Sequence, residues 1–476
     1  MADDIKEDKK AFDAKLAAVL ISRLPFCENM ISAERLSGGA SQETYRLVIK
    51  TADGQEQKLA LRRAPGGIQG DKTPEHPGLE TEALLMRLAR QAGVPEPEVY
   101  WVLTEEDGLG NGFIMEWLEG EALGARINRS PEFESIRSSL AYECGKVLAK
   151  IHAIDLGNEG LDRKLARIAP ETFIRQTWEK YQALNTPQPM IDFTARWLLE
   201  NLPDENRTTL VHNDFRTGNF MINPEGLVAV LDWELAHIGD PMRDLGWICT
   251  NSWRFGGDRP VGGFGEYEDL FRGYEEVSGI RVNAGHVKFW EVFGSFWWSV
   301  GCLGMVEHYR NGPDQTVERP AIGRRSSECQ VDCVNLLIPG PVDLVKASDQ
   351  QSTLDMPRAD ELLVSVRDFL RDDLMAATEG RLNFLSRVAS NSLDIVLREW
   401  QLGPEAKRRE LAALKAFYPD DQREDLESLK WHLVQSLREG SQLLDDAKLQ
   451  SCLRNAVVNQ IAIDQPRYSG FKRALA

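Results

Sequence analysis

The sequence is poor in the features that mark exported, disulfide-bonded and nucleic-acid-binding proteins. Its 476 residues include only seven cysteines, an odd number with no Cys-x-x-Cys pair, so we expect free thiols in a reducing compartment. The first ten residues, MADDIKEDKK, lack the apolar segment of a signal peptide. Lysine and arginine total 56 against 74 acidic residues, a net charge of −18, which disfavours binding to nucleic-acid phosphates. These shortages predict a cytoplasmic protein that does not bind nucleic acid.

Long hydrophobic runs are also missing. The most apolar segment is FWEVFGSFWWSVGCLGMV, and its uncharged part, residues 292–306, is shorter than the roughly 20 residues that cross a bilayer. We therefore expect a buried helix rich in aromatic residues and no membrane association. The composition, 42% hydrophobic and 27% charged, is typical of a folded globular protein. At roughly 150 residues per domain, the length predicts two or three domains.

The first third of the chain alternates strand-like and helical patterns. Two β-rich runs, TYRLVIK and KLALRR, flank a turn at Asp53-Gly54 and predict an antiparallel hairpin. Leucines at helical spacing predict a helix over residues 79–92. Two further strand-like runs, VYWVL and GFIMEWLEG, follow it. The region beyond is mainly helical, and a small hairpin between residues 210 and 233 interrupts it.

The C-terminal part has helical periodicity almost throughout. Residues 339–357 are rich in proline, serine, glutamine and aspartate, and this composition predicts a linker. Three apolar stripes beyond it predict helices, the first over Leu362–Leu370 and the second ending before Gly403-Pro404. No cluster of catalytic residue types lies among them. We interpret this part as a small helical bundle that acts as a scaffold or interaction module.

The residues that indicate chemistry lie in VHNDFRTGNFMINPEGLVAVLDW. Asp214 is followed five residues later by Asn219 and eighteen residues later by Asp232, at the end of an apolar run. Phosphoryl transfer needs a carboxylate that accepts the proton of the nucleophile, oxygen ligands for Mg²⁺ and cations at the phosphates. A loop carboxylate such as Asp214 can accept the proton, and Asn219 and Asp232 can hold the metal across the small hairpin.

These residues resemble the catalytic loop and metal-binding aspartate of the protein-kinase-like fold. The form H-N-D-x-x-x-x-N followed by L-D-W is similar to that of the aminoglycoside phosphotransferase and choline kinase family. The resemblance implies an α+β, two-lobe fold followed by an all-α C-terminal bundle. The domains that we predict are an N-terminal helical extension (1–30), a small antiparallel β lobe that binds nucleotide (31–119), a large catalytic lobe (120–338), the linker (339–357) and a helical accessory domain (358–476).

The same resemblance implies ATP and Mg²⁺ as cofactors and assigns roles to single residues. Asp214 would be the catalytic base, Arg216 a second cation at the transferring phosphate, and Asn219 and Asp232 the metal ligands. The cofactor-binding residues would be a phosphate loop, a cation with its acidic partner, and a hinge beside adenine: Ser37, Gly38, Gly39, Ala40, Ser41, Arg62, Glu82, Glu116, Trp117 and Leu118.

Some of these assignments are not settled by the motif alone. Arginine stands where the family usually has lysine, and either Arg62 or Arg63 can be the inward residue, although strand alternation favours Arg62. We expect His212 to support the catalytic loop from beneath. Asp240 and Asp244 are expected to cap and brace the following helix rather than contact ATP.

Within this family, the segments RLSGGASQETYRL and LDWELAHIGDPMRDL are most similar to the kinase domain of acyl-CoA dehydrogenase fusion proteins and their bacterial relatives. That branch implies phosphorylation of a hydroxyacyl-CoA, with an acyl-CoA dehydrogenase-like protein in the same pathway. The tail from Arg358 resembles a small helical protein that accompanies such kinases. Two alternatives are an aminoglycoside or choline-type kinase and a catalytically silent kinase-like scaffold. A scaffold is expected to have lost the base or the metal ligands, yet all three are present.

Overall fold

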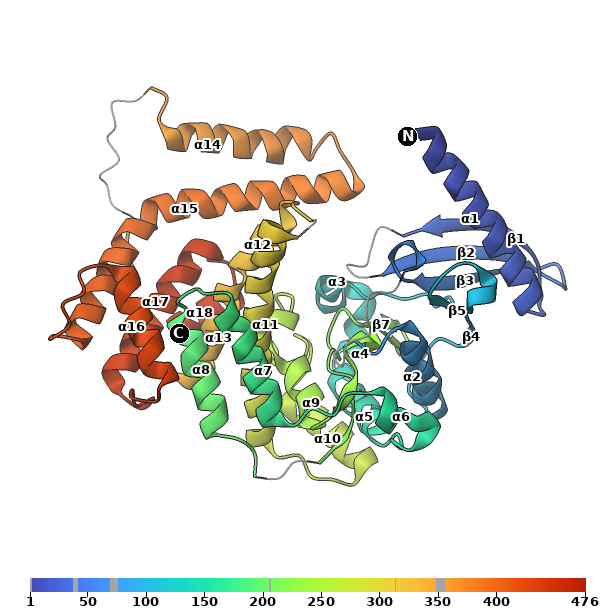
Figure 1. The fold of residues 1–476 in the computed structure, drawn as a ribbon, viewed down its shortest axis with the longest axis horizontal. Coiled ribbons are helices and arrows are strands. Elements are labelled where there is room, and N and C mark those ends of the chain that lie inside the picture. Colours follow the sequence, from blue (N-terminus) through green and yellow to red (C-terminus); the bar gives the residue numbers. More distant parts are fainter. Residues whose placement is uncertain (1, 37–41, 69–75, 205–206, 313, 348–355) are drawn as a thin grey trace. The chain divides into compact units, whose positions relative to one another are not determined.

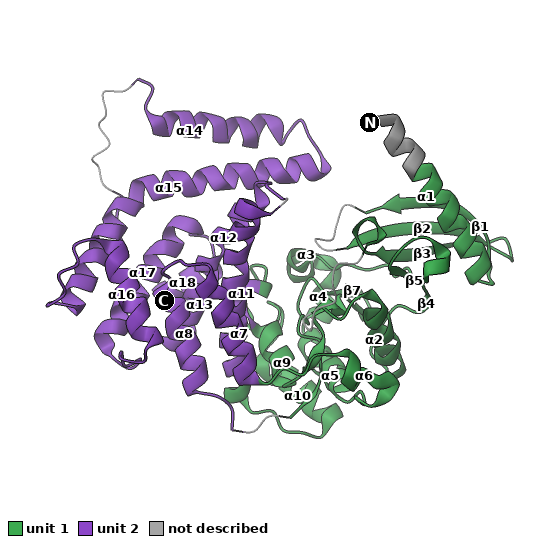
Figure 2. Cartoon of the chain, viewed as in Figure 1, with its two compact units in different colours: residues 1–169, 205–249, 253–287 green, residues 170–204, 250–252, 288–476 purple. Residues whose placement is uncertain are grey.

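The structure is a computed structural model that describes residues 2–36, 42–68, 76–204, 207–312, 314–347 and 356–476. Contacts divide the chain into two compact units (Figure 2). Unit 1 comprises Met1–Ala169, Glu205–Cys249 and Trp253–Val287. Unit 2 comprises Pro170–Asp204, Thr250–Ser252 and Lys288–Ala476. Each unit is described by itself below.

Unit 1 begins with a helix that packs on an antiparallel sheet (Figure 1). The five strands have the order β1-β2-β3-β5-β4. Leu47 and Ile49 on the second strand and Leu16 and Leu20 on the helix are fully buried in one core, because the apolar residues alternate along the strand and recur at helical spacing. This sheet confirms the predicted antiparallel β lobe. The elements are α1 (Ala2–Arg23), β1 (Cys27–Arg35), β2 (Glu43–Thr51), β3 (Glu56–Arg63), α2 (Leu79–Gln91), β4 (Val99–Val102) and β5 (Gly112–Glu116).

The predicted hairpin and helix are both present in this lobe. β2 and β3 pair antiparallel up to Lys50 and Glu56, and the turn between them contains Asp53-Gly54. Gly54 has a φ of 87°, a left-handed conformation that glycine adopts without strain. Leu85 and Leu88 of α2 are buried, as the spacing predicts.

The rest of unit 1 is mainly helical and carries two small strand pairs. Strand β6 (Thr209–Val211) pairs with β9 (His237–Gly239), and β7 (Phe220–Asn223) pairs with β8 (Gly226–Val230). α5 and α10 pack closely because Gly145 and Gly273 have no side chain: a Cβ at Gly145 would lie 2.1 Å from the carbonyl oxygen of Leu270. The helices are α3 (Gly124–Arg129), α4 (Glu134–Arg137), α5 (Leu140–His152), α6 (Leu161–Lys164), α9 (Met242–Cys249) and α10 (Tyr267–Ser278).

The described residues of unit 2 form helices joined by loops, and they share one main core. Met190, Val334, Leu414, Leu433 and Val458, from five different helices, are buried in this core. α14 lies alongside the first half of α15 (Figure 1). The helices are α7 (Pro170–Ala183), α8 (Pro189–Glu200), α11 (Ala284–Asn311), α12 (Glu318–Arg324), α13 (Ser326–Leu337), α14 (Ala359–Asp368), α15 (Gly380–Phe417), α16 (Leu426–Arg438), α17 (Ala447–Asp464) and α18 (Ser469–Leu475), and the first residues of α11 belong to unit 1.

The aromatic-rich segment forms the buried helix that the sequence predicts. It lies within α11, where Val292, Phe293 and Phe296 are buried. Among the residues that the structure describes, no helix combines the length and apolar character needed to cross a membrane. The side chains of Val292, Phe293 and Phe296 pack in the protein core.

Helix α15 runs past the position where the sequence predicts a helix end. The prediction that a helix ends before Gly403-Pro404 is wrong, because α15 continues through both residues. Proline removes one helical hydrogen bond, but Leu397 before it and Leu414 after it are buried, and this packing holds the helix together. The first predicted stripe, Leu362–Leu370, is helical as expected, and its Phe369 is 54% exposed.

The predicted linker begins against the core of unit 2. Ile338 and Val345 are buried, and the backbone N–H of Val345 donates to Asn459 Oδ1 at 2.8 Å. Residues 348–355 lie outside the described residues. The compact units follow packing alone, so the division into extension, two lobes, linker and accessory domain stays a prediction.

Candidate active site

The loop between β6 and β7 is held from below by one buried carboxylate. Asp244 on α9 accepts the backbone N–H groups of His212 and Asn213 at 2.8 Å and 2.7 Å, and His152 Nε2 lies 3.1 Å from it. Burial alone would raise the pKa of Asp244, but the hydrogen bonds from His152 and the loop hold this pKa below its ordinary value. Asn213 has a φ of 66°, which asparagine tolerates. The backbone beside Asp214 is thus fixed.

Asp240 and Asp244, the two aspartates of GDPMRDL, stabilise different segments of unit 1. Asp240 Oδ1 accepts the backbone N–H of Met242 at 3.0 Å, at the start of α9, and Asp240 Oδ2 lies 2.6 Å from His286 Nε2. This agrees with the expected capping role. Asp244, which was expected to brace the helix, instead braces the loop that carries Asp214.

The Asp214 carboxylate is surrounded by donors. Its Oδ1 accepts hydrogen bonds from Arg216 Nε at 2.9 Å and from Trp247 Nε1 at 2.8 Å, and its Oδ2 accepts one from the side-chain amide of Asn219. The whole residue is only 9% exposed. Three donors from three positions therefore fix the orientation of this carboxylate, which is what a positioned general base requires.

Arg216 is restrained on two sides. Its Nε contacts Asp214, and its guanidinium carbon lies 4.1 Å from the ring centroid of Trp253, a cation–π contact. Neither Trp247 nor Trp253 is among the site residues predicted from the sequence. Trp247 follows Asp244 by three residues on α9, so both lie on one helix face, and this spacing is a signal that points to Trp247. We find no comparable signal for Trp253.

Asn219 and Asp232 lie close together at the base of the β7–β8 hairpin. Phe220 pairs with Val230, and the carbonyl of Asn219 accepts the backbone N–H of Leu231 at 2.8 Å, so Asn219 lies opposite the residue that precedes Asp232. The side-chain N–H group of Asn219 is used on Asp214, which leaves its Oδ1 as the amide atom that can face a cation.

The amide oxygen of Asn219 and the carboxylate of Asp232 are oxygen donors of the kind that Mg²⁺ prefers. The described residues contain no group of three or more His, Cys, Asp or Glu side chains that could hold a metal ion. Mg²⁺ usually takes one or two protein ligands and completes its shell with phosphate oxygens and water. The Asn219–Asp232 pair fits such a shared site.

Arg62 is the inward arginine of β3. Its Nε forms an ion pair with Glu82 Oε1 at 2.8 Å, and its Nη2 lies 2.5 Å from Asp232 Oδ1. Arg63 instead contacts Glu43 at 3.0 Å and the carbonyl of Leu109 at 2.6 Å. The preference for Arg62 from strand alternation therefore agrees with the geometry. Burial raises the pKa of Glu82 to about 7, and the charge of Arg62 opposes this shift.

The predicted hinge leads directly from the sheet to the β7–β8 hairpin. Glu116 ends β5, and two residues later the chain passes Leu118 on its way to Glu121, whose backbone exchanges two hydrogen bonds with Ile222, at 2.8 Å and 3.0 Å. Trp117 Nε1 donates to Glu119 Oε1 at 3.0 Å. The predicted phosphate loop, Ser37, Gly38, Gly39, Ala40 and Ser41, lies outside the described residues.

Known protein families match two parts of this chain. A sequence model described as the phosphotransferase enzyme family matches residues 32–280. A second model, described as a domain of unknown function (DUF6285), matches residues 376–468. The first match contains all the residues predicted for the site, and the second falls in the C-terminal helices.

Among curated proteins, similar relatives are larger than this chain. Acyl-CoA dehydrogenase family member 10 of Mus musculus is 36% identical over 219 residues, which cover 44% of this chain and 19% of that protein. Acyl-CoA dehydrogenase family member 11 of Pongo abelii is 24% identical over 425 residues, 82% of this chain and 51% of that protein. This chain therefore spans about half, or less, of the length of these relatives.

A solved structure supports the fold. The crystal structure of a Ralstonia eutropha protein, provisionally named an aminoglycoside phosphotransferase, matches with a TM-score of 0.53 and 25% sequence identity. The match covers 67% of this chain and 95% of that one. The match therefore covers about two thirds of this chain and nearly all of the matched protein.

Proposed function

This chain belongs to the phosphotransferase enzyme family and is a small-molecule kinase, and on that premise we propose that it transfers the γ-phosphoryl group of ATP, with Mg²⁺, to the hydroxyl group of a hydroxyacyl-CoA. The observation that carries the chemistry is one continuous set of contacts. It runs from Asp214 to Asn219, along the hairpin to Asp232, and from there to Arg62 and Glu82. A proton acceptor, two oxygen donors and a cation thus meet in unit 1.

The proposed reaction assigns one task to each of these side chains. As the substrate oxygen forms its bond to the γ-phosphorus, the bond between that phosphorus and the bridging oxygen breaks and ADP leaves. A carboxylate oxygen of Asp214 accepts the proton of the hydroxyl group. Mg²⁺, when bound, would neutralise part of the negative charge on the phosphate groups. Trp247, which donates to the same carboxylate, orients the base.

The cations have separate places in this proposal. Arg216, next to the base, stabilises the charge that develops on the transferring phosphoryl group. Arg62 contacts the non-transferred phosphates, with Glu82 holding its guanidinium group in position. Asn219 Oδ1 and Asp232 hold the metal. Backbone groups of the Ser37–Ser41 loop and of the hinge at residues 116–118 contact the nucleotide.

The proposed substrate class, a hydroxyacyl-CoA, is inferred from the names of similar proteins. Two relatives of this chain are named as acyl-CoA dehydrogenase family members, and the matched segments make up 19% and 51% of those proteins. A kinase tied to acyl-CoA chemistry has a hydroxyl on an acyl chain as its natural acceptor. We further propose that the protein is cytoplasmic. We also propose that an acyl-CoA dehydrogenase-like enzyme consumes the phosphorylated product.

The test is a substrate panel with the purified full chain and Mg·ATP. The panel contains 3-, 4- and 5-hydroxyacyl-CoAs, the corresponding free hydroxy acids, choline and aminoglycosides, and product mass is read by mass spectrometry. A phosphorylated acyl-CoA supports the proposal. A phosphorylated aminoglycoside or choline, or no product while Mg·ATP still binds, contradicts it and favours the other kinase class or the silent scaffold.

A further inference from the structure

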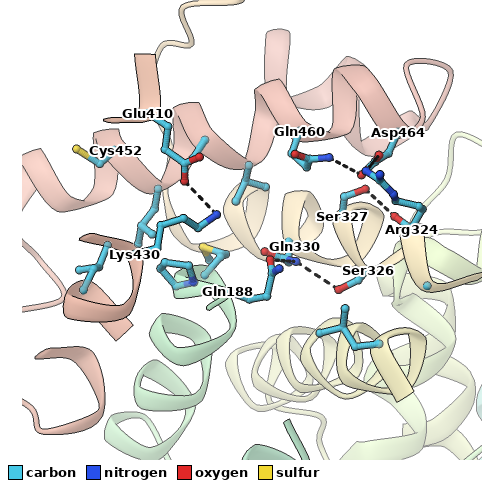
Figure 3. Close-up of a pocket in the computed structure, with 18 of the residues that line it drawn as sticks. Gln188, Arg324, Ser326, Ser327, Gln330, Glu410, Lys430, Cys452, Gln460 and Asp464 are labelled. Atoms are coloured by element: carbon cyan, nitrogen blue, oxygen red, sulfur yellow. Dashed lines mark hydrogen bonds and ion pairs between the residues drawn. The ribbon is translucent and has the colours of Figure 1, made fainter. Parts of the chain in front are cut away.

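Unit 2 contains a cavity of about 410 Å³ that phosphoryl transfer does not use (Figure 3). This volume lies in the range of about 300–1,000 Å³ that is usual for small-molecule sites. Residues from α8, α11, α12, α13, α15, α16 and α17 line it, so it exists only because the C-terminal helices pack on helices of the preceding segment.

One part of the cavity wall is aliphatic. Leu414, Leu433 and Leu453, on three different helices, are at most 3% exposed, and Leu303 and Val306 of α11 also line the cavity. None of the described residues that line it is aromatic. The wall therefore favours a flexible alkyl chain, and it offers no ring on which a nucleobase or another planar group could stack.

The charged groups of the lining neutralise one another. Lys430 Nζ lies 3.3 Å from Glu410 Oε1. Arg324 lies 3.0 Å from Asp464 Oδ1 and 2.5 Å from Glu399 Oε2. Figure 3 shows the Lys430–Glu410 pair and the Arg324–Asp464 pair as two separate groups of the lining. An anionic ligand would have to displace a carboxylate from its partner, so the lining disfavours a carboxylate or phosphate.

Neutral polar groups occupy a third part of the lining. Gln330 Nε2 lies 3.3 Å from both Gln188 Oε1 and Ser326 Oγ, and Figure 3 shows these three side chains gathered together. Gln330 and Ser326 are buried, 9% and 3% exposed. Hydrogen bonds of this length are weak, so the amide can exchange them for shorter ones to a ligand. A neutral amide has both a donor and an acceptor that complement this group.

We propose that this cavity binds an aliphatic chain that carries a neutral amide, with the chain against Leu414, Leu433 and Leu453 and the amide at Gln330, Gln188 and Ser326. This binding does not depend on the phosphotransfer reaction in unit 1. It gives the C-terminal helices a role in ligand recognition, in addition to any role as a scaffold.

The experiment is isothermal titration calorimetry of the full chain with octanamide, hexanamide, butanamide and octanoate. Octanamide should bind at one site, and each added methylene should tighten binding about threefold to fourfold until the chain fills the cavity. Octanoate, with the same chain and a charge, should bind at least tenfold more weakly. Equal binding of octanoate, no dependence on chain length, or no binding of octanamide up to its solubility would overturn the proposal.

Two alanines of α15 provide a matched pair of variants. Ala413 lines the cavity, whereas Ala416, three residues further along the same helix, is exposed and outside the lining. Ala413→Phe should weaken octanamide binding at least tenfold, and Ala416→Phe should leave it within twofold. Unchanged binding in Ala413→Phe would contradict the location of the site.

Circular dichroism will show whether Ala413→Phe folds. If it does not fold, a third variant, Gln330→Leu, still tests the proposal. Gln330→Leu removes the amide of the lining and keeps a side chain of similar size. It should weaken octanamide at least fivefold and reduce the difference between octanamide and octanoate. An undiminished preference for octanamide in this variant would remove Gln330 from the recognition of the ligand and overturn the proposal.

Discussion

The candidate active site in unit 1 and the cavity in unit 2 use charged residues in opposite ways. In unit 1, Arg62 forms an ion pair with Asp232, and the Asp214 carboxylate accepts three side-chain hydrogen bonds within the same loop and hairpin region. In unit 2, Arg324 and Lys430 pair with carboxylates at the edge of an aliphatic cavity. The difference indicates that unit 1 is arranged for chemistry on charged groups and unit 2 for binding a neutral chain.

The largest effect is expected from removing the proposed base. Asp214→Asn keeps the shape of the side chain and should lower kcat about 10³-fold, within the range that general base catalysis contributes. Binding of Mg·ATP, measured by calorimetry, should change less than threefold. Asp162→Asn, at an exposed position of unit 1, is the control and should retain full activity. A kcat within tenfold of wild type in the Asp214 variant would remove Asp214 from this role.

Removing the charge beneath the loop should act on stability. Asp244→Asn replaces charged acceptors for two backbone N–H groups and should cost about 2 kcal/mol, roughly a 30-fold change in the unfolding equilibrium. The pKa of Asp244 lies below its ordinary value near 4, so its stabilisation is complete above about pH 4 and is lost as pH falls further.

Urea unfolding of wild type and Asp244→Asn at several pH values measures this effect. The difference in the free energy of unfolding should be constant between pH 5 and pH 7 and should shrink towards pH 3. A difference that stays constant down to pH 3 would show that the charge of Asp244 does not stabilise the loop.

The adjacent arginines of β3 separate nucleotide binding from structure. Arg62→Met should raise the KM for ATP at least tenfold, because Arg62 is the cation of the network. Arg63→Met should leave this KM within threefold and mainly lower the Tm, since Arg63 contacts Glu43 and the carbonyl of Leu109. Steady-state kinetics and thermal melts of both variants distinguish them. The reverse pattern would exchange the two roles.

The smallest predicted effect concerns the orientation of the base. Trp247→Phe removes one hydrogen bond to Asp214 and should lower kcat about fivefold without changing the KM for ATP. Trp253→Phe keeps an aromatic face for Arg216 and should change kcat less than threefold. Equal effects of both substitutions would indicate that Trp247 acts through packing and not through its N–H group.

Local patterns predicted the parts of the fold and the site that depend on neighbouring residues. The β2–β3 hairpin, α2 and the spacing of Asp214, Asn219 and Asp232 are all properties of short segments, and the structure brings the last three to one hairpin. The choice between Arg62 and Arg63 also followed from strand alternation. Spacing alone could not show that Asp244 supports the loop, because that contact joins elements far apart in the sequence.

The features that could not be predicted from the sequence depend on tertiary packing. α15 continues through Gly403 and Pro404 because buried leucines on both sides outweigh one lost hydrogen bond. Trp253 reaches Arg216 across a gap in sequence that carries no periodic signal. The cavity of unit 2 needs helices from α8 to α17, so no segment by itself contains its pattern.

The most direct test of the central claim is product formation by the wild-type chain beside its Asp214→Asn variant. Both proteins are incubated with Mg·ATP and a 4-hydroxyacyl-CoA, and phosphorylated acyl-CoA is quantified by mass spectrometry. We predict that wild type forms phosphorylated product, and that the Asp214→Asn variant forms about 10³-fold less while it still binds Mg·ATP. Equal amounts of product from both proteins, or none from wild type, would contradict it.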